Sequence, residues 1–297
     1  MPDVVVIVGP TASGKTALAL SLANRLGGEI VNTDSMAVYQ GMDIGTAKPS
    51  KSEQALVPHH LLDVWPIEHA VSVEQFQALG RSAIAEIQSA GGIPILVGGS
   101  GLYVSAIIDD LQFPGTDETI RTRLQVECDA VGPEALHARL AELDPAAAIA
   151  ILPTNGRRIV RALEVIELTG APFTATLPTP SSVYEDVHII GLELDRDLLD
   201  ARIEARVDAM WAAGFVDEVR GLPGLESTPT ASRALGYSQI LAMLRGECSE
   251  EEARLDTIAA TRRFARRQQR WWARDDRVTW VDALSPTLVD DVLEVMK

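Results

Sequence analysis

The sequence has 297 residues and a formal net charge of -16. Its 46% hydrophobic and 23% charged residues exclude a disordered chain and are typical of a globular protein with a sizeable core. No apolar run approaches the ~20 residues that cross a bilayer, and the N-terminus lacks the features of a signal peptide. Cys128 and Cys248 are not part of a CxxC pair. We therefore expect a cytoplasmic protein without a zinc site. The acidic charge disfavours a nucleic-acid partner, although seven arginines between Arg262 and Arg277 allow a local basic surface.

The first third of the chain alternates between strand and helix signals. β-Branched and apolar runs without polar alternation are typical of strands that are buried on both faces of a parallel sheet. Strands are expected at residues 4–8, 29–32 and 93–97, with helices at 16–26 and 73–90, while residues 56–65 predict an irregular segment. Strands that alternate with helices indicate a parallel α/β sheet with helices on both faces.

The pattern changes after residue 116. Only helical signals occur as far as Gly170, and a stretch rich in Pro, Thr and Ser follows at 171–182. The run VHIIGLEL then predicts another strand, and two long helices are expected at 197–220 and 250–274. We interpret this order as an α/β core formed by residues 1–116 and 183–297, interrupted by an all-helical insertion at 117–182.

The segment GPTASGKT matches the phosphate-binding loop pattern G-x-x-x-x-G-K-[ST] in full, between an expected strand and an expected helix. In such a P-loop the backbone N–H groups surround phosphate oxygens, the lysine adds a point charge, and the Ser/Thr hydroxyl can bind Mg²⁺. The loop is expected to consist of Gly9, Pro10, Thr11, Ala12, Ser13, Gly14, Lys15 and Thr16. Thr16 is the candidate Mg²⁺ ligand.

The acidic residue that usually accompanies such a loop in kinases and NTPases is only partly visible. The strand at 93–97 is followed by GGSG and supplies no acid. Among the strands expected in the first third of the chain, only the one at 29–32 is followed closely by an acid, Asp34, which can serve Mg²⁺, act as a general base, or simply form a turn or helix cap. The loop therefore binds a phosphorylated molecule, and a departing diphosphate would use the same cradle as ATP.

Several motifs together resemble the bacterial tRNA dimethylallyltransferases, which are also called tRNA isopentenyltransferases. They are GPTASGKT, NTDSMAVYQGMDIGTAKP, VPHHLLDVWP, ILVGGSGLYVSAI, RRIVRALEV and TRRFARRQQRWWAR, in that order. The resemblance implies a P-loop NTPase-like core with a small helical insertion. It also implies transfer of a dimethylallyl group from dimethylallyl diphosphate to N6 of the adenosine 3′-adjacent to the anticodon of tRNA, with the P-loop holding the donor diphosphate.

The resemblance also assigns residues. Asp34 matches the general base, Ser100 stands where the family usually has Thr, and Lys15 stabilises the leaving diphosphate, so these three are the expected catalytic residues. Arginines at helical spacings after Arg262 are by themselves typical of a solvated helix face. The resemblance implies instead that they contact tRNA. The expected tRNA-binding residues are Asp34, Ser35, Met36, Ala37, Ser100, Arg121, Arg157, Arg158, Arg161, Arg233, Arg266, Arg267, Gln268 and Trp271.

Some positions stay open or depart from the family. Lys48 either pairs with phosphate or is a surface lysine, and the pair His59-His60 is expected to be structural rather than metal-binding. Asn155 and Arg270 replace an acid and a Thr that the family usually has. The alternative functions are an adenylate isopentenyltransferase, which needs neither insertion nor arginine helix, a small-molecule P-loop kinase, and a non-catalytic RNA-binding module.

Overall fold

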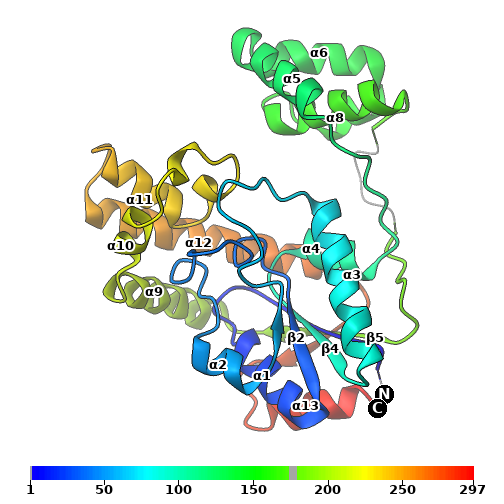
Figure 1. Ribbon diagram of the computed structural model, residues 1–297, viewed down its shortest axis with the longest axis vertical. Helices are drawn as coiled ribbons and strands as arrows, with labels where there is room; N and C mark the ends of the chain where they lie inside the picture. Colours follow the sequence, from blue (N-terminus) through cyan, green and yellow to red (C-terminus); the bar gives the residue numbers. More distant parts are fainter. Residues whose placement is uncertain (1, 174–178) are drawn as a thin grey trace. The chain divides into compact units, whose positions relative to one another are not determined.

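The computed structural model describes residues 2–173 and 179–297 (Figure 1). It divides into two compact units, one formed by Met1–Asp110 and Ser182–Lys297 and the other by Leu111–Ser181. The second unit thus begins six residues before the expected start of the insertion at 117. The reason is local, because Arg161 donates hydrogen bonds to the carbonyl oxygens of Pro114 and Gly115 and so attaches this segment to the helical unit. Residues 174–178 of the expected Pro- and Thr-rich stretch lie outside the described residues.

The first unit contains a six-stranded sheet in which every neighbouring pair is parallel, in the order β3-β2-β4-β1-β5-β6. The strands are β1 Val4–Val8, β2 Gly28–Asn32, β3 His59–His60, β4 Ile93–Val97, β5 Val187–Glu193 and β6 Val278–Asp282. Every residue of β1 is fully buried between β4 and β5, as its β-branched run predicts. The expectation of an irregular segment at 56–65 missed β3, whose two residues are too few to show a period.

Helices cover both faces of this sheet, which confirms the predicted α/β class. On one face, α1 (Lys15–Leu26) and α13 (Leu288–Val295) pack against alternate side chains of β1. On the other face, α3 (Val73–Ser89), α4 (Gly101–Ile108), α11 (Tyr237–Leu244) and α12 (Glu250–Trp272) contribute to a second core. The short helix α2 (Lys51–Leu56) precedes β3. None of the helices that the structure describes has the length and apolarity needed to span a bilayer.

The expected helix at 197–220 is two helices, α9 (Arg196–Ala212) and α10 (Phe215–Arg220). Gly214 between them has a φ of 95°, a left-handed conformation that ends α9 and that residues with a Cβ adopt at a cost. Two 3₁₀ turns, Leu225–Ser227 and Ala231–Arg233, then lead to α11.

In the described part of the second unit the regular elements are all helices. Its helices are α5 (Glu118–Val131), α6 (Pro133–Leu143), α7 (Pro145–Ala150) and α8 (Gly156–Thr169). They enclose a core of their own that includes Leu124, Leu140, Ile159 and Leu163. Where the chain leaves and re-enters the first unit, Asp109 and Ser182 form an antiparallel bridge, and the Val183 N–H donates to the Ile108 carbonyl oxygen at 2.9 Å.

Candidate active site at the phosphate-binding loop

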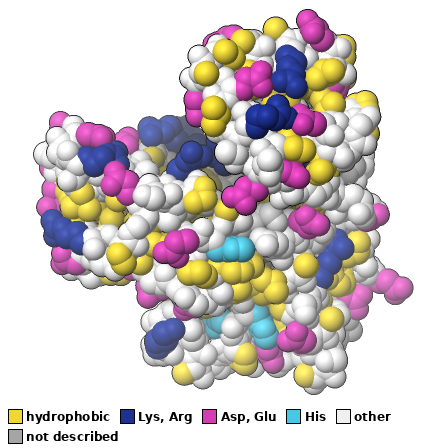
Figure 2. Space-filling model, turned by 45° about the horizontal axis from the view of Figure 1, so that its top comes forward, with side chains coloured by type: hydrophobic (Ala, Val, Ile, Leu, Met, Phe, Trp, Pro, Cys, Tyr) yellow, Lys and Arg dark blue, Asp and Glu magenta, His cyan; other side chains and the backbone are white. Residues whose placement is uncertain are grey.

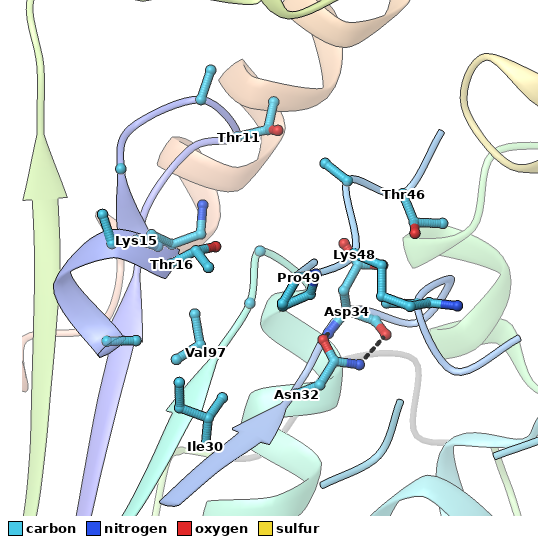
Figure 3. A pocket seen from close by; sticks show the side chains of 18 of the residues that line it. Thr11, Lys15, Thr16, Ile30, Asn32, Asp34, Thr46, Lys48, Pro49 and Val97 are labelled. Carbon is cyan, nitrogen blue, oxygen red and sulfur yellow. Dashed lines mark hydrogen bonds between the residues drawn. The ribbon is translucent and has the colours of Figure 1, made fainter. Parts of the chain in front are cut away.

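A pocket of about 500 Å³ lies where β1, β2 and β4 end, the usual place for a ligand in a parallel sheet. The P-loop forms one side of it, and Asp34 with the segment Thr46–Pro49 forms the other (Figure 3). Ile30 and Val97 add apolar surface at the strand ends. The pocket therefore combines a phosphate cradle, a carboxylate and an apolar wall.

The backbone of the P-loop turns as the glycine pattern predicts. Gly9 and Gly14 have φ values of 138° and 99°, and Ala12 also has a positive φ of 64°. A Cβ at Gly9 would lie 3.1 Å from the carbonyl oxygen of Leu192, so the loop could not pass β5 as closely with a side chain there. Gly14 then caps the N-terminus of α1, where Thr16 is exposed.

Lys15 has an unusual electrostatic environment. Its ammonium donates to the carbonyl oxygens of Gly9 and Pro10 at 3.1 and 2.6 Å. Burial, helped by the Arg206 guanidinium, lowers the pKa of Lys15 to about 7, while the Asp34 carboxylate opposes this shift. The pocket thus holds two cationic groups with too little negative charge to balance them, a deficit that an anionic ligand would fill.

Arg206 was not expected from the sequence. It comes from α9 and lines the pocket together with Arg202, one helical turn away. Burial lowers the pKa of Arg206, while Asp34 acts in the opposite sense. In the sequence of α9 these arginines alternate with acids as on a solvated helix face, so no local signal distinguished them.

Asp34 is fixed by hydrogen bonds next to β2. The Asn32 side-chain oxygen accepts the Asp34 N–H, and its amide nitrogen donates to the Asp34 carbonyl oxygen, both at 3.0 Å. Figure 3 marks a hydrogen bond between these two residues. The carboxylate oxygen Oδ1 accepts the Met36 N–H at 2.8 Å. Within the described residues no hydrogen bond or ion pair engages Oδ2, so one oxygen stays available to a ligand. Ser35 and Met36 are partly exposed nearby, and Ala37 is buried and lines the pocket.

The position of Ser100 differs from that of the P-loop residues. It is the residue before α4, and its hydroxyl makes no capping hydrogen bond. The preceding Gly98 and Gly99 line the pocket, whereas Ser100 is not among the lining residues. At Gly98 a Cβ would lie 2.2 Å from the Thr33 hydroxyl oxygen, so this turn packs too tightly for a side chain.

Two carboxylate clusters hold the wall opposite the P-loop. In the first, the buried Lys48 ammonium, 2% exposed, pairs with Asp43 at 2.6 Å and Asp63 at 2.5 Å and donates to the Tyr39 carbonyl oxygen at 2.9 Å. Lys48 is therefore neither a surface lysine nor free to pair with phosphate, because its charge is used to hold its own loop.

Glu218 forms the second cluster, from α10. Its carboxylate accepts three consecutive backbone N–H groups, those of Asp43, Ile44 and Gly45, at 3.0, 2.6 and 3.1 Å. It also accepts the Tyr237 hydroxyl at 2.6 Å, and burial with this neighbouring carboxylate raises the pKa of Tyr237. Tyr237, four residues after the expected tRNA contact Arg233, is thus a buried part of the cluster that holds the pocket wall.

The arginines of α12, together with Arg274 just after it, are either paired with acids or unpaired. Arg262 pairs with Glu204 at 2.8 Å and with Asp200 of α9, so its charge is largely neutralised. Arg266, Arg267, Arg270 and Arg274 make no ion pair within the described residues, and Arg267 lies over the Phe264 ring at 5.6 Å. Across the face drawn in Figure 2, acidic side chains are widely spread while Lys and Arg gather in a few groups.

Two other expected tRNA-binding residues lie on this helix: Gln268 lines the pocket, and Trp271 packs against Gly101 at the start of α4. Gln268 is buried, and its Oε1 accepts the Thr11 N–H at 2.8 Å. Trp271 is 36% exposed, and its indole lies where a Cβ of Gly101 would be. Arg233 is exposed in the second 3₁₀ turn.

The helical unit carries the remaining expected arginines. Arg121 and Arg161 both pair with the fully buried Glu164, at 2.9 and 3.0 Å. Their guanidinium groups therefore balance a charge inside this unit. Arg157 and Arg158 are exposed at the start of α8, where Asn155 caps the helix by accepting the Arg158 N–H at 3.3 Å. The departure at Asn155 thus keeps the capping function that an acid would have.

The histidine pair makes structural contacts. His59 bonds through Nδ1 to the Val57 carbonyl oxygen at 2.7 Å, and His60 bonds through Nε2 to Glu29 at 2.6 Å. Among the described residues no group of three or more His, Cys, Asp or Glu side chains could hold a metal ion.

Comparison with known proteins gives concordant matches. The family model described as IPP transferase matches residues 37–275. A tRNA dimethylallyltransferase of Thermobifida fusca is 59% identical over 98% of this chain and 93% of its own length. One of Salinispora arenicola is 56% identical over 99% of this chain and 86% of its own length.

Solved structures agree with these matches. A tRNA isopentenylpyrophosphate transferase of Bacillus halodurans is 41% identical, with a TM-score of 0.72 over 99% of this chain and 94% of that chain. A eukaryotic dimethylallyltransferase acting on tRNA is 25% identical, with a TM-score of 0.82 over 99% of this chain and 77% of that chain.

Proposed function

Since the chain belongs to the IPP transferase family, we propose that it is a tRNA dimethylallyltransferase. It transfers the dimethylallyl group of dimethylallyl diphosphate to N6 of the adenosine 3′-adjacent to the anticodon and releases diphosphate. The observation that carries the proposal is the pocket itself, in which Lys15 of the P-loop and Arg206 of α9 face the Asp34 carboxylate, one oxygen of which is free. Because its substrate is tRNA, we place the enzyme in the cytoplasm.

The P-loop is proposed to bind the donor diphosphate. Its backbone N–H groups and the N-terminus of α1 surround the phosphate oxygens, and Lys15 and Arg206 contribute charge from two sides. As the bond between donor carbon and oxygen breaks, negative charge grows on the departing diphosphate, and these groups stabilise it without rearrangement. The apolar Ile30 and Val97 suit the dimethylallyl chain.

Mg²⁺ is proposed as the cofactor. The exposed Thr16 hydroxyl is a hard oxygen donor of the kind that this ion prefers, together with diphosphate oxygens and water. When bound, Mg²⁺ supplies neutralisation of the diphosphate charge.

Asp34 is proposed as the general base. The N6 amine of adenine is a weak nucleophile because its lone pair is delocalised into the ring. As N6 forms its bond to the donor carbon, it loses one proton to the free carboxylate oxygen of Asp34, while the bonding electrons leave with diphosphate. The Ser100 hydroxyl, which caps no helix, is proposed to hydrogen-bond the substrate.

tRNA is proposed to bind through exposed and partly exposed arginines, which approach the phosphate backbone. From the expected set we retain Arg157, Arg158, Arg233, Arg266 and Arg267 as direct contacts. Arg121 and Arg161 act first on Glu164, so their contribution to tRNA binding is indirect. A base in a single-stranded loop leaves its stack at a cost of only a few kcal/mol, which suits an anticodon loop.

The alternatives fit less well. A free adenine nucleotide as acceptor leaves the helical unit and the exposed arginines without a role. A kinase is expected to place an acid beside the P-loop strand, and the acid that follows β5, Asp195, instead caps α9 by accepting the Asp197 and Leu198 N–H groups. An RNA-binding module leaves the P-loop unexplained.

A transfer assay tests the proposal. The purified protein is incubated with radiolabelled dimethylallyl diphosphate, Mg²⁺ and either an unmodified tRNA with adenosine after the anticodon or AMP. We expect label in tRNA only. Label in AMP only would assign the adenylate activity, and ATP consumption without label transfer would assign a kinase.

A further inference from the structure

Gln268 differs from the residues around it on α12. Arg267 before it and Gln269 after it are at least partly exposed, whereas Gln268 is only 5% exposed. A side chain so buried offers little surface to a macromolecule. The expectation that Gln268 contacts tRNA therefore does not follow from its position.

The Gln268 amide instead connects two loops of the pocket. Its Oε1 accepts the Thr11 N–H at 2.8 Å, which joins residues 257 positions apart in the chain. Its Nε2 lies against Gly99, where a Cβ would be only 1.7 Å away. Thr11, Gly99 and Gln268 all line the pocket. The amide fits between the P-loop and the Gly98-Gly99 turn because Gly99 has no side chain.

This contact adds a support to the part of the P-loop that precedes α1, where the Lys15 ammonium also donates to the carbonyl oxygens of Gly9 and Pro10. Residues from Lys15 onward belong to α1 and are held by its hydrogen bonds. Between Gly9 and Gly14, the Ser13 N–H makes a long bond of 3.3 Å to the Pro10 carbonyl oxygen, and Ala12 has an unfavourable positive φ. The Gln268 side chain thus holds the backbone at Thr11, directly before the strained Ala12. Donors that bind a diphosphate are effective only when they are held in place beforehand.

We propose that Gln268 is a positioning residue that holds the P-loop ready for the donor diphosphate and is not a tRNA contact. The inference rests on the proposed function, because it takes diphosphate as the ligand of the loop. It also gives α12 two roles on different faces, since its exposed arginines face solvent while Gln268 faces the donor cradle.

The test uses matched variants of the full chain. Gln268→Met keeps the size of the side chain and removes the acceptor, while Gln268→Glu keeps an acceptor for the Thr11 N–H. Gly99→Ala displaces the amide from the other side, and Arg267→Ala serves as the tRNA-binding control. Binding of inorganic pyrophosphate with Mg²⁺ is measured by calorimetry, and binding of an unmodified tRNA transcript by gel shift.

We expect Gln268→Met and Gly99→Ala to weaken pyrophosphate binding by about tenfold and to raise the donor KM, with tRNA affinity within about twofold of the wild type. Gln268→Glu should recover most of the pyrophosphate affinity, and Arg267→Ala should show the reverse pattern. Weakened tRNA binding with unchanged pyrophosphate binding in Gln268→Met would overturn the inference. A wild-type protein that binds no pyrophosphate would instead count against the proposed function itself.

Discussion

Asp34 has two carboxylate oxygens with different surroundings, and this difference sets its chemistry. Oδ1 accepts the Met36 N–H, and Oδ2 is free. An asparagine in its place would preserve the first contact and lose the basic oxygen. We therefore expect Asp34→Asn to lower kcat for transfer by about 10³-fold, within the range for loss of a general base, with tRNA affinity changed by a few-fold at most. Single-turnover transfer and gel-shift titrations measure the two quantities. A severe loss of tRNA affinity would identify Asp34 as a contact residue instead.

Lys15 makes donor binding depend on pH. Its pKa of about 7 is depressed, so the charged form predominates below pH 7 and is lost as the pH rises through that value. Because diphosphate binds the charged form, the donor KM should rise above pH 7, approaching tenfold per pH unit between about pH 8 and 9, where the diphosphate itself stays ionised.

A permanently charged side chain provides the control for this pH dependence. Lys15→Arg should raise the donor KM at neutral pH because a guanidinium fits the loop differently, but its KM should stay flat up to about pH 9. If the KM of both proteins rises in parallel, the titrating group is not Lys15.

At the level of single residues, sequence reasoning found the groups that local motifs specify. The P-loop residues and Asp34 lie together at one pocket, and their pattern in the chain is short and characteristic. Arg206 was missed because its place at the pocket depends on what α9 faces after folding, and the burial of Gln268 against the P-loop could not be read from the sequence of α12 for the same reason. Arg121 and Arg161 have the positive charge expected of tRNA-binding residues. Only the structure shows that both form ion pairs with the buried Glu164.

The segment from Asp43 to Pro49 shows how elements distant in the chain shape one wall of the pocket. Glu218 accepts four hydrogen bonds there, three from backbone and one from Tyr237. We expect Glu218→Ala to lower the free energy of unfolding by about 3 kcal/mol, because several donors lose a charged acceptor together. Tyr237→Phe removes one of the four and should cost about 1 kcal/mol. Urea denaturation measures both, and equal losses would show that the carboxylate does not organise this turn.

Elements with a strong local signal were predicted well, and those that depend on distant partners were not. The buried strands β1 and β4 have the expected bounds because apolar runs of this length need no further context. β6 forms only by pairing with β5 at the edge of the sheet, and the sequence reading did not anticipate it. The break at Gly214 was also overlooked, because a glycine within a helical pattern is ambiguous until its φ is known.

For the whole molecule, a net charge of -16 coexists with a proposed anionic substrate. Some arginines form ion pairs with Asp or Glu side chains, and others are exposed without such a partner. The exposed, unpaired arginines are therefore the groups that attract a phosphate backbone. Arg267 is of this kind, whereas Arg263 on the same helix faces Asp256 at 3.5 Å. We expect Arg267→Ala to reduce the slope of log affinity for tRNA against log salt concentration by about 0.7 to 0.9. Arg263→Ala is the matched control and should leave the slope nearly unchanged. Identical slopes in the two variants would mean that Arg267 is a solvent-exposed residue that does not contact a tRNA phosphate.

The bridge between Asp109 and Ser182 has a consequence for how such a chain can be altered. The Arg277 guanidinium holds the Asp109 carboxylate at 2.6 Å, and Arg81 donates to the Asp109 carbonyl oxygen at 2.7 Å, so the exit point is fixed within the first unit. Excising residues 111–181 would therefore leave two ends that are already neighbours, and a short turn can join them at little entropic cost. We expect a shortened chain closed by a glycine-rich turn to unfold cooperatively and to retain pyrophosphate binding, as thermal scans and calorimetry would show. In genetic terms we expect the helical unit to be exchangeable for another domain whose own chain ends lie close together.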